Sequence, residues 1–375
     1  MQIYLDYSAT TPPRIEVINM MQSILQKHWG NPSSLHEWGE RSALILEQAR
    51  IQVADLIHSN PDEIIFTSGG TESDNLAIMG VVRNYQNPQH LIISSVEHSA
   101  INEPVKLLEK WGWEISRLPV DKWGRINPED LEKAIKKNTV LISIIYGQSE
   151  IGTIQPIEEL GKIARSHEIL FHTDAVQIVG RLPIDVRTLP IDLLSISSHK
   201  IYGVQGAGAL YIKSGVKITP LLLGGGQEEK LRSGTQAVPI IAGFGLAAEL
   251  ISKEIFTEEE RLIKLRDRFF NLLADVPNLI PTGHPVYRLP HHVSFCVRNN
   301  SEINGRTLVR KMNLAGIGIS AGSACNSGQI LPNPVLLAMG FSEQEALATI
   351  RLTLGKETNR DDIEWTAKVL KQILE

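Results

Sequence analysis

Short apolar runs of strand length alternate, over much of the chain, with segments whose apolar residues recur at helical spacing. In one such segment Leu46, Ala49 and Val53 fall on one face, as in an amphipathic helix. Strands that alternate with helices usually pair in parallel. The sequence therefore predicts an α/β fold with a mostly parallel central sheet flanked by helices. The expected strands are 64–68, 91–95, 140–145, 169–173, 193–197 and 209–212.

The run 193–197 leads into a lysine, Lys200, at the expected mouth of the sheet. A lysine amine in such a place is costly unless it is used, and a desolvated amine can anchor pyridoxal phosphate covalently. The neighbouring Ser197 and His199 are polar donors of the kind that a phosphate group needs. The alternative is a surface lysine that extends its amine into solvent.

The preceding run, 169–173, ends on a carboxylate, Asp174. Pyridoxal enzymes keep the ring nitrogen of the cofactor protonated with an aspartate partner, so that the ring can act as an electron sink. The ends of two successive strands would face one crevice, where open α/β sheets bind ligands. Asp174 could also cap a helix that begins at Ala175.

A Gly-Gly turn follows the expected strand 64–68 and leads into a helix. Gly69 and Gly70 allow the backbone to approach an anion, and the amides from Thr71 onward point out of the positive end of the helix. Three parts of a pyridoxal-phosphate site (an amine, a carboxylate and a phosphate loop) are thus expected on one sheet.

Together these residues resemble the fold-type I pyridoxal-phosphate enzymes of the class V aminotransferase group, and specifically the cysteine desulfurases. The resemblance runs essentially from end to end. The residues that carry it are 4–12 (YLDYSATTP), 30–34 (GNPSS) with His36, 66–73 (FTSGGTES), 95–98 (SVEH), 174–177 (DAVQ), 198–203 (SHKIYG), 232–235 (RSGT), 322–325 (GSAC) and Ile350 with Arg351.

The resemblance implies a homodimer in which each chain has two domains. Residues 15–252 would form the large cofactor-binding domain. Residues 1–14 and 253–375 would form a smaller α+β domain that carries a mobile loop with the catalytic cysteine. The charge-rich stretch 249–268 is expected to be a helix that leaves the large domain, and 293–297 is expected to be a strand.

The resemblance also implies roles for the cofactor-binding and substrate-binding residues. Lys200 would bind pyridoxal 5'-phosphate covalently and then act as a base, while His98 would stack on the ring and move protons. The expected contacts of the cofactor are Gly70, Thr71, His98, Asp174, Gln177, Ser197, His199, Lys200 and, from the neighbouring subunit, Thr235. Asn31 and Arg351 would bind the substrate L-cysteine, with Arg351 on its carboxylate. Arg351 could equally form a structural salt bridge, and His98 could cap a helix.

Cys325 lies in 320–328, a segment rich in glycine and serine that suits a mobile loop better than a core. In the family this cysteine attacks the sulfur of the bound substrate and leaves as a persulfide, because a thiolate is a strong nucleophile. The resemblance also leaves open that Cys325 transiently ligates an iron–sulfur cluster. Cys296 falls inside an expected strand and is expected to pack in the core. No intrinsic metal site is expected, since His291 and His292 are neighbours and point apart.

Three departures from the family pattern concern residues near the expected site. Ser149 replaces an asparagine, Asp74 replaces a common asparagine beside the phosphate turn, and Val204-Gln205 replaces Pro-Lys. Selenocysteine lyase or cysteine/cystine C–S lyase activity would use the same lysine and aspartate. An inactive paralogue that acts as a binding subunit would be favoured by their loss, and both are present.

The charge and cysteine content restrict the partners and the compartment. The net charge of −5 shows no polyanion-binding signature, so no direct nucleic-acid partner is expected. Two cysteines fit a reducing compartment, and the N-terminus lacks a signal-peptide pattern, so a cytoplasmic protein is expected. The uncharged stretch 312–342 is interrupted by polar residues and is expected to be loop-rich rather than a membrane span. The expected partner is a sulfur acceptor, either an iron–sulfur scaffold protein or a tRNA-thiolation relay.

Overall fold

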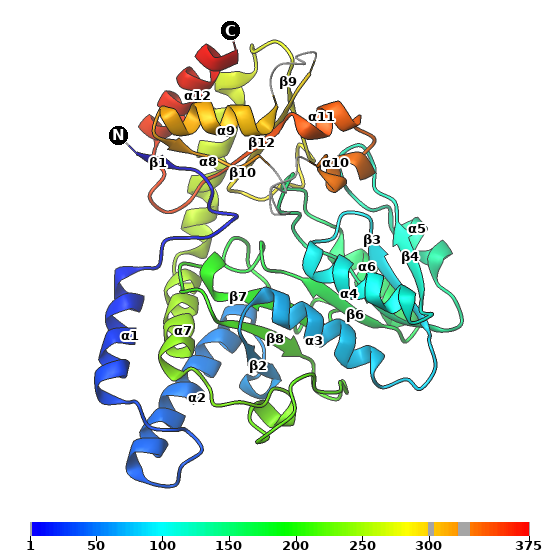
Figure 1. The fold of residues 1–375 in the computed structure, drawn as a ribbon, viewed down its shortest axis with the longest axis vertical. Helices are drawn as coiled ribbons and strands as arrows, with labels where there is room; N and C mark the ends of the chain where they lie inside the picture. Colours follow the sequence, from blue (N-terminus) through cyan, green and yellow to red (C-terminus); the bar gives the residue numbers. More distant parts are fainter. Residues whose placement is uncertain (1, 299–303, 322–330, 375) are drawn as a thin grey trace.

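The computed structural model describes residues 2–298, 304–321 and 331–374, and a seven-stranded sheet forms its centre (Figure 1). The sheet order is β2-β8-β7-β6-β5-β3-β4. Strand β8 runs against the direction of the other six, which confirms the predicted mostly parallel sheet. The strands are β2 (Ile64–Thr67), β3 (His90–Ser94), β4 (Glu114–Leu118), β5 (Thr139–Ser143), β6 (Leu170–Asp174), β7 (Leu193–Ser197) and β8 (Gly208–Ile212).

The six strands expected from apolar runs all form, with ends that differ by at most two residues. Strand β4 was not predicted. It lies at the edge of the sheet, and only its last residue, Leu118, is buried. An edge strand that exposes Glu114 and Arg117 has no continuous apolar run, so its sequence lacks the signal that marks the central strands.

Helices cover both faces of this sheet, and each face has its own apolar cluster. Ile92 and Phe171 belong to the cluster beneath α2, α6 and α7, whereas Leu91 and Ile93 belong to the cluster beneath α3 and α4. This division follows from the alternation of side chains along a strand. The helices are α1 (Ile15–Lys27), α2 (Glu37–Ile57), α3 (Gly70–Val82), α4 (Ser99–Lys110), α5 (Pro128–Ala134), α6 (Ile157–Ser166) and α7 (Val238–Ser252).

The chain termini and the last third of the chain build a smaller α+β unit above the sheet (Figure 1). Strand β1 (Ile3–Tyr4) pairs with β11 (Ile317–Gly318), and β10 (His292–Val297) lies between β9 (Leu279–Pro281) and β12 (Thr349–Thr353). A separate apolar cluster fills this unit. Its helices are α8 (Ile255–Leu273), α9 (Gly305–Leu314), α10 (Pro334–Ala338), α11 (Glu343–Leu347) and α12 (Arg360–Leu374).

The stretch 249–268, expected as one helix, is divided between α7 and α8. Glu254 lies at the break, where its carboxylate accepts hydrogen bonds from Arg14 at 2.7 and 3.0 Å and from Lys356 at 2.8 and 3.0 Å. Both cations hold the pKa of Glu254 low, at about 2. The ion pairs join the start of α1, the α7–α8 junction and the loop after β12, so they stabilise the junction of the two units.

Cys296 is fully buried in β10, which confirms a core residue, and His291 and His292 are both packing residues with no exposed surface. Among the described residues no helix is long and apolar enough to cross a membrane. The described part of 312–342 contains the end of α9, strand β11 and helix α10, so it is more regular than expected.

Candidate active site

Strands β6 and β7 bring the lysine and the aspartate to one edge of the sheet. The two strands are parallel neighbours, with Thr173 opposite Leu194 and Asp174 opposite Ser195. Strand β6 ends at Asp174, and β7 continues into a single 3-10 turn, η2 (Ser198–Lys200). The carboxyl ends of parallel strands meet at the same edge, so Asp174 and Lys200 approach each other as the sequence predicted.

The glycine turn after β2 brings the N-terminus of α3 against the same edge. Gly69 adopts φ 154° and ψ 179°, which L side chains rarely adopt. A Cβ atom on Gly70 would lie 2.8 Å from Val176 Cγ2 and 3.6 Å from Ser197 Cβ. The first turn of α3 therefore packs directly against the residues that follow β6 and end β7.

These residues fit the phosphate group of pyridoxal phosphate. The Ser197 hydroxyl is buried next to Gly70 and has no hydrogen-bond partner within the described ranges. A buried hydroxyl without a partner is costly, and a phosphate oxygen would satisfy it. Thr71 is exposed in the first turn of α3, where amides and the helix dipole favour an anion.

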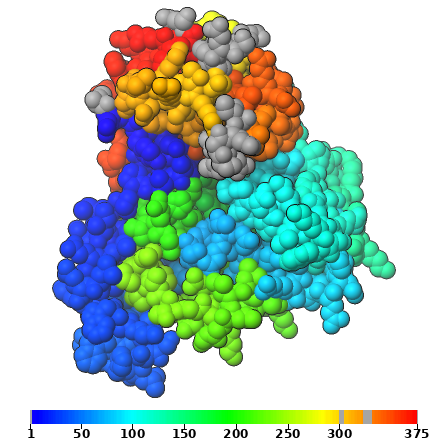
Figure 2. Space-filling model, viewed as in Figure 1, coloured from blue at the N-terminus to red at the C-terminus, as the bar shows by residue number. Residues whose placement is uncertain are grey.

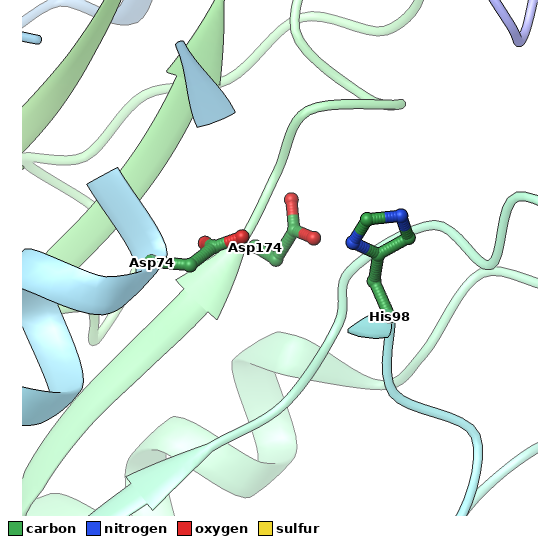
Figure 3. Close-up of side chains that lie close together, drawn as sticks. All are labelled: Asp74, His98 and Asp174. Carbon is green, nitrogen blue, oxygen red and sulfur yellow. The ribbon is translucent and has the colours of Figure 1, made fainter. Parts of the chain in front are cut away.

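Figure 3 shows Asp174 between Asp74 and His98, with one ligand atom of each residue within 4.8 Å of the others. The Asp174 carboxylate accepts a hydrogen bond from the Val176 amide at 3.0 Å, and residues 176–180 form turns. Asp174 therefore caps a turn and no helix follows it. Burial raises the pKa of Asp174, and the hydrogen bond from the Val176 amide opposes this shift.

His98 is both a helix cap and a neighbour of Asp174. It precedes α4, and its Nδ1 accepts a hydrogen bond from the Ala100 amide at 3.1 Å. Because Nδ1 is an acceptor here, the proton of the neutral ring is on Nε2. The capping alternative and the active-site position are thus compatible, since the cap fixes the orientation of the imidazole.

Asp74 lies in a different environment from the one that the sequence predicted. It is 1% exposed on the inner side of α3 and faces Asp174. Burial and then the neighbouring Asp174 carboxylate raise the pKa of Asp74 well above its usual value. His172 Nε2 lies 3.7 Å from Asp74 Oδ1, but burial lowers the pKa of His172 to about 3 and leaves it neutral.

The Lys200 amine is bound by the N-terminal segment of the chain. Lys200 Nζ donates to the Ala9 carbonyl at 2.8 Å and to the Ser8 carbonyl, and Gln177 Nε2 also donates to the Ser8 carbonyl at 2.9 Å. Burial, with a contribution from Arg351, lowers the pKa of Lys200 to about 8. His199 is also neutral, because burial and then Lys200 lower its pKa to about 4, and its Nδ1 lies 3.1 Å from Thr10 Oγ1. Segment 6–11 is a part of the site to which the sequence assigned no role, although 4–12 is one of the motifs of the resemblance.

Arg351 lies in β12, nearly buried, and faces two carboxylates. Its Nη2 lies 2.9 Å from Asp6 Oδ1, and its Nη1 lies 3.1 Å from Glu150 Oε1 and 3.2 Å from the Ser149 carbonyl. The salt-bridge alternative is thus realised, and the arginine also lies close enough to Lys200 to depress the lysine pKa.

Two expected residues do not meet this site within the described chain. Asn31 is exposed between α1 and α2, and its Oδ1 accepts a hydrogen bond from the Ser33 amide at 2.9 Å. Thr235 is exposed in the segment before α7. Cys325 lies outside the described residues. The roles of Asn31, Thr235 and Cys325 stay predictions.

Comparisons with known proteins identify the family. The model of the aminotransferase class-V family matches residues 3–365. A cysteine desulfurase, IscS, from Dictyoglomus turgidum is 46% identical over all of this chain and 95% of its own length. A solved NifS-like protein has a TM-score of 0.93 and 35% identity, covering 100% of this chain and 99% of that chain. The structure described as SspA in complex with cysteine has a TM-score of 0.84 and 36% identity, covering 94% of this chain and 99% of that chain.

The chain belongs to the aminotransferase class-V family, as the family model and the fold show. Within that family it belongs to the cysteine desulfurases, because relatives of that name at 40–46% identity align over nearly the whole chain.

Proposed function

We propose that this cysteine desulfurase uses pyridoxal phosphate, converts L-cysteine to L-alanine and holds the released sulfur on Cys325. The observation that carries the proposal is the convergence of three groups at one edge of the sheet. They are the Lys200 amine, the buried Asp174 carboxylate and the glycine-opened N-terminus of α3. The solved SspA structure with cysteine supports L-cysteine as the substrate.

The residues that would hold the cofactor are those that the sequence predicted. Lys200 would bind it covalently, Asp174 would hold the proton of its ring nitrogen, and Gln177 would donate to its phenolic oxygen. Its phosphate would be bound by Gly70, Thr71, Ser197 and His199, with Thr235 from the neighbouring subunit. When bound, pyridoxal phosphate withdraws electrons from the α-carbon of an amino acid.

Two residues of the chain would move protons. The depressed pKa of Lys200, about 8, leaves a fraction of its amine neutral near pH 7, and a neutral amine can accept the α-proton of the substrate. His98 presents Nε2–H because Nδ1 is fixed by the Ala100 amide, so it is a donor toward the ring and the substrate thiol. Arg351 would bind the substrate carboxylate and orient the α-carbon.

Cys325 would then receive the sulfur. Its thiolate forms a bond to the substrate sulfur while the carbon–sulfur bond breaks, and the electron pair of that bond remains on the carbon that becomes the alanine methyl group. The persulfide on Cys325 is passed to an acceptor protein for iron–sulfur cluster assembly or tRNA thiolation, and Cys325 could transiently ligate a cluster during this transfer.

The experiment that tests the proposal measures the products from L-cysteine. We expect alanine and sulfane sulfur from the wild-type protein, and we expect Cys325→Ser to retain the cofactor but to transfer no sulfane sulfur. Cys296→Ser, which changes the buried cysteine of β10, is the control and should retain sulfur transfer. Pyruvate and ammonia as products, or sulfur delivery at the normal rate by Cys325→Ser, would instead favour the lyase alternative.

The proposed assembly is a homodimer. Helices α1 and α2 both pack against α7, and together with the loop between them, here called the α1–α2 hairpin, they protrude at the lower left of the molecule in Figures 1 and 2. The hairpin exposes large apolar side chains, and Leu35 is 95% exposed. Patches of this kind mark protein interfaces. The apolar residues are Leu25, Trp29, Leu35, Trp38 and Leu44. A second copy over this face would also bring Thr235 and Asn31 to positions that they cannot reach within one chain.

We propose the same domain division and the same compartment that the sequence predicts. Residues 15–252 would form the large domain, and 1–14 with 253–375 the small one, since most buried apolar residues of each unit belong to a cluster of their own. A cytoplasmic location would keep the Cys325 thiol reduced, as its chemistry requires.

A further inference from the structure

The environment of Arg351 is already rich in negative charge. One guanidinium faces two carboxylates, those of Asp6 and Glu150, at 2.9 and 3.1 Å. The Arg351 side chain is 8% exposed, so solvent screens these charges only weakly. The carboxylate of an amino acid that approached this arginine would be the third on one cation. Adding it is unfavourable unless one of the two resident carboxylates leaves.

Glu150 belongs to a rigidly held loop. The Gln148 side chain accepts hydrogen bonds from the Glu150 amide and, at 3.2 Å, from the Ile151 amide. The Ser149 carbonyl accepts one bond from His292 Nε2 at 2.9 Å and another from Arg351 Nη1 at 3.2 Å. The Glu150 carboxylate and the carbonyl of the preceding residue, Ser149, therefore contact the same nitrogen of Arg351, Nη1. It is suited to be a permanent counter-ion.

Asp6 is held differently. It meets Arg351 at the other terminal nitrogen, Nη2, and its side chain is 21% exposed, compared with 12% for Glu150. Asp6 lies in the N-terminal segment that passes between the two units of the fold (Figure 1), two and three residues before the carbonyls that bind the Lys200 amine. Segment 6–11 thus binds both Arg351, through the Asp6 carboxylate, and Lys200, through the Ser8 and Ala9 carbonyls.

We propose that Asp6 is a displaceable placeholder for the substrate carboxylate. The carboxylate of an α-amino acid replaces Asp6 at Arg351 Nη2, while Glu150 and the Ser149 carbonyl retain Nη1. Asp6 thereby sets how tightly the site binds amino acids relative to amines that lack a carboxylate. The inference rests on the proposed role of Arg351 as the carboxylate-binding residue.

The test compares two inhibitors of L-cysteine turnover by the holoenzyme that differ only in a carboxylate, L-serine and ethanolamine. Asp6→Asn removes the competing charge with little change of shape. We expect it to lower the inhibition constant of L-serine about three- to tenfold and to leave that of ethanolamine unchanged. Asp6→Ser should change the ratio of the two constants in the same direction. Glu150→Gln, which leaves Asp6 in place on Nη2, should lower the constant for L-serine less than Asp6→Asn does.

Two further variants separate this inference from the proposed function. Asp275→Asn removes an exposed ion pair with Lys371 and is the matched control, for which the ratio should equal that of the wild type. Arg351→Gln should weaken inhibition by L-serine and leave inhibition by ethanolamine unchanged. An unchanged inhibition constant for L-serine would refute the role of Arg351 itself. The placeholder role of Asp6 is wrong if Arg351→Gln weakens the binding of L-serine but Asp6→Asn does not strengthen it. It is also wrong if Asp6→Asn strengthens the binding of both inhibitors equally.

Discussion

Buried carboxyl groups surround the reactive edge of the sheet, and Glu97 is one that has no assigned role in the reaction. Its Oε1 accepts hydrogen bonds from the Ile145 amide at 2.9 Å, from the Ser94 amide at 3.3 Å and from the Ser94 hydroxyl. Its Oε2 has no hydrogen-bond partner in the described parts of the chain. Burial raises the pKa of Glu97 to about 8. A neutral carboxyl group matches this arrangement, with its carbonyl oxygen as the acceptor.

The raised pKa of Glu97 predicts a pH-dependent stability. Between the usual pKa of 4.5 and about 8, the folded state holds a proton that the unfolded state has lost. The contribution of Glu97 is therefore fully present below pH 4.5 and is lost as the pH rises toward 8. Glu97→Gln keeps the acceptor oxygen and removes the titration.

We expect the free energy of unfolding of Glu97→Gln, relative to wild type, to rise between pH 5.5 and 8, by up to about 1 kcal/mol per pH unit. Urea unfolding at several pH values measures this difference. Glu103→Gln, which alters an exposed carboxylate of α4, should run parallel to wild type. A difference between Glu97→Gln and wild type that did not change with pH would show that Glu97 is ionised in the folded protein.

At the scale of elements, the contact between α3 and the end of β6 controls the phosphate site. Replacement of glycine by alanine near a helix start normally costs little or stabilises the helix. At Gly70 the new Cβ would lie 2.8 Å from Val176 Cγ2, so α3 or Val176 has to move. The amides of the first turn would move with the helix.

Gly70→Ala should therefore weaken the binding of pyridoxal phosphate about tenfold, by the loss of roughly 1.4 kcal/mol of positioned hydrogen bonds. Titration of the cofactor-stripped protein measures this affinity. Val176→Ala in the same chain removes the colliding atom and should restore most of the affinity. If the double variant binds as weakly as Gly70→Ala, the collision is not the cause.

At the scale of the whole molecule, the α1–α2 hairpin predicts the assembly. Trp38 is 52% exposed on this hairpin, and a charge at its position would be costly to bury against a second copy. Trp38→Glu should yield monomers and reduce cofactor occupancy, because Thr235 would no longer reach the partner site. Sedimentation velocity and cofactor absorbance measure the two effects.

Leu314 at the end of α9 is 80% exposed and provides the matched control, since Leu314→Glu changes the same kind of surface outside the hairpin. We expect Leu314→Glu to remain a dimer. Full cofactor occupancy in a monomeric Trp38→Glu variant would contradict a phosphate site that two subunits share.

The sequence by itself determined the order of the central strands and helices, because buried strands and amphipathic helices leave local periodic signals. It also determined which residues meet at the site through Lys200 and Asp174, since strand ends in a parallel sheet share one edge. The tertiary structure decided what periodicity cannot record: the edge strand β4, the break between α7 and α8, and the approach of Asp6 and Ser8 to residues nearly 200 or more positions away. It also decided the raised pKa of Asp74, because the pKa of a carboxyl group depends on what lies around it after folding, and no local pattern contains that information.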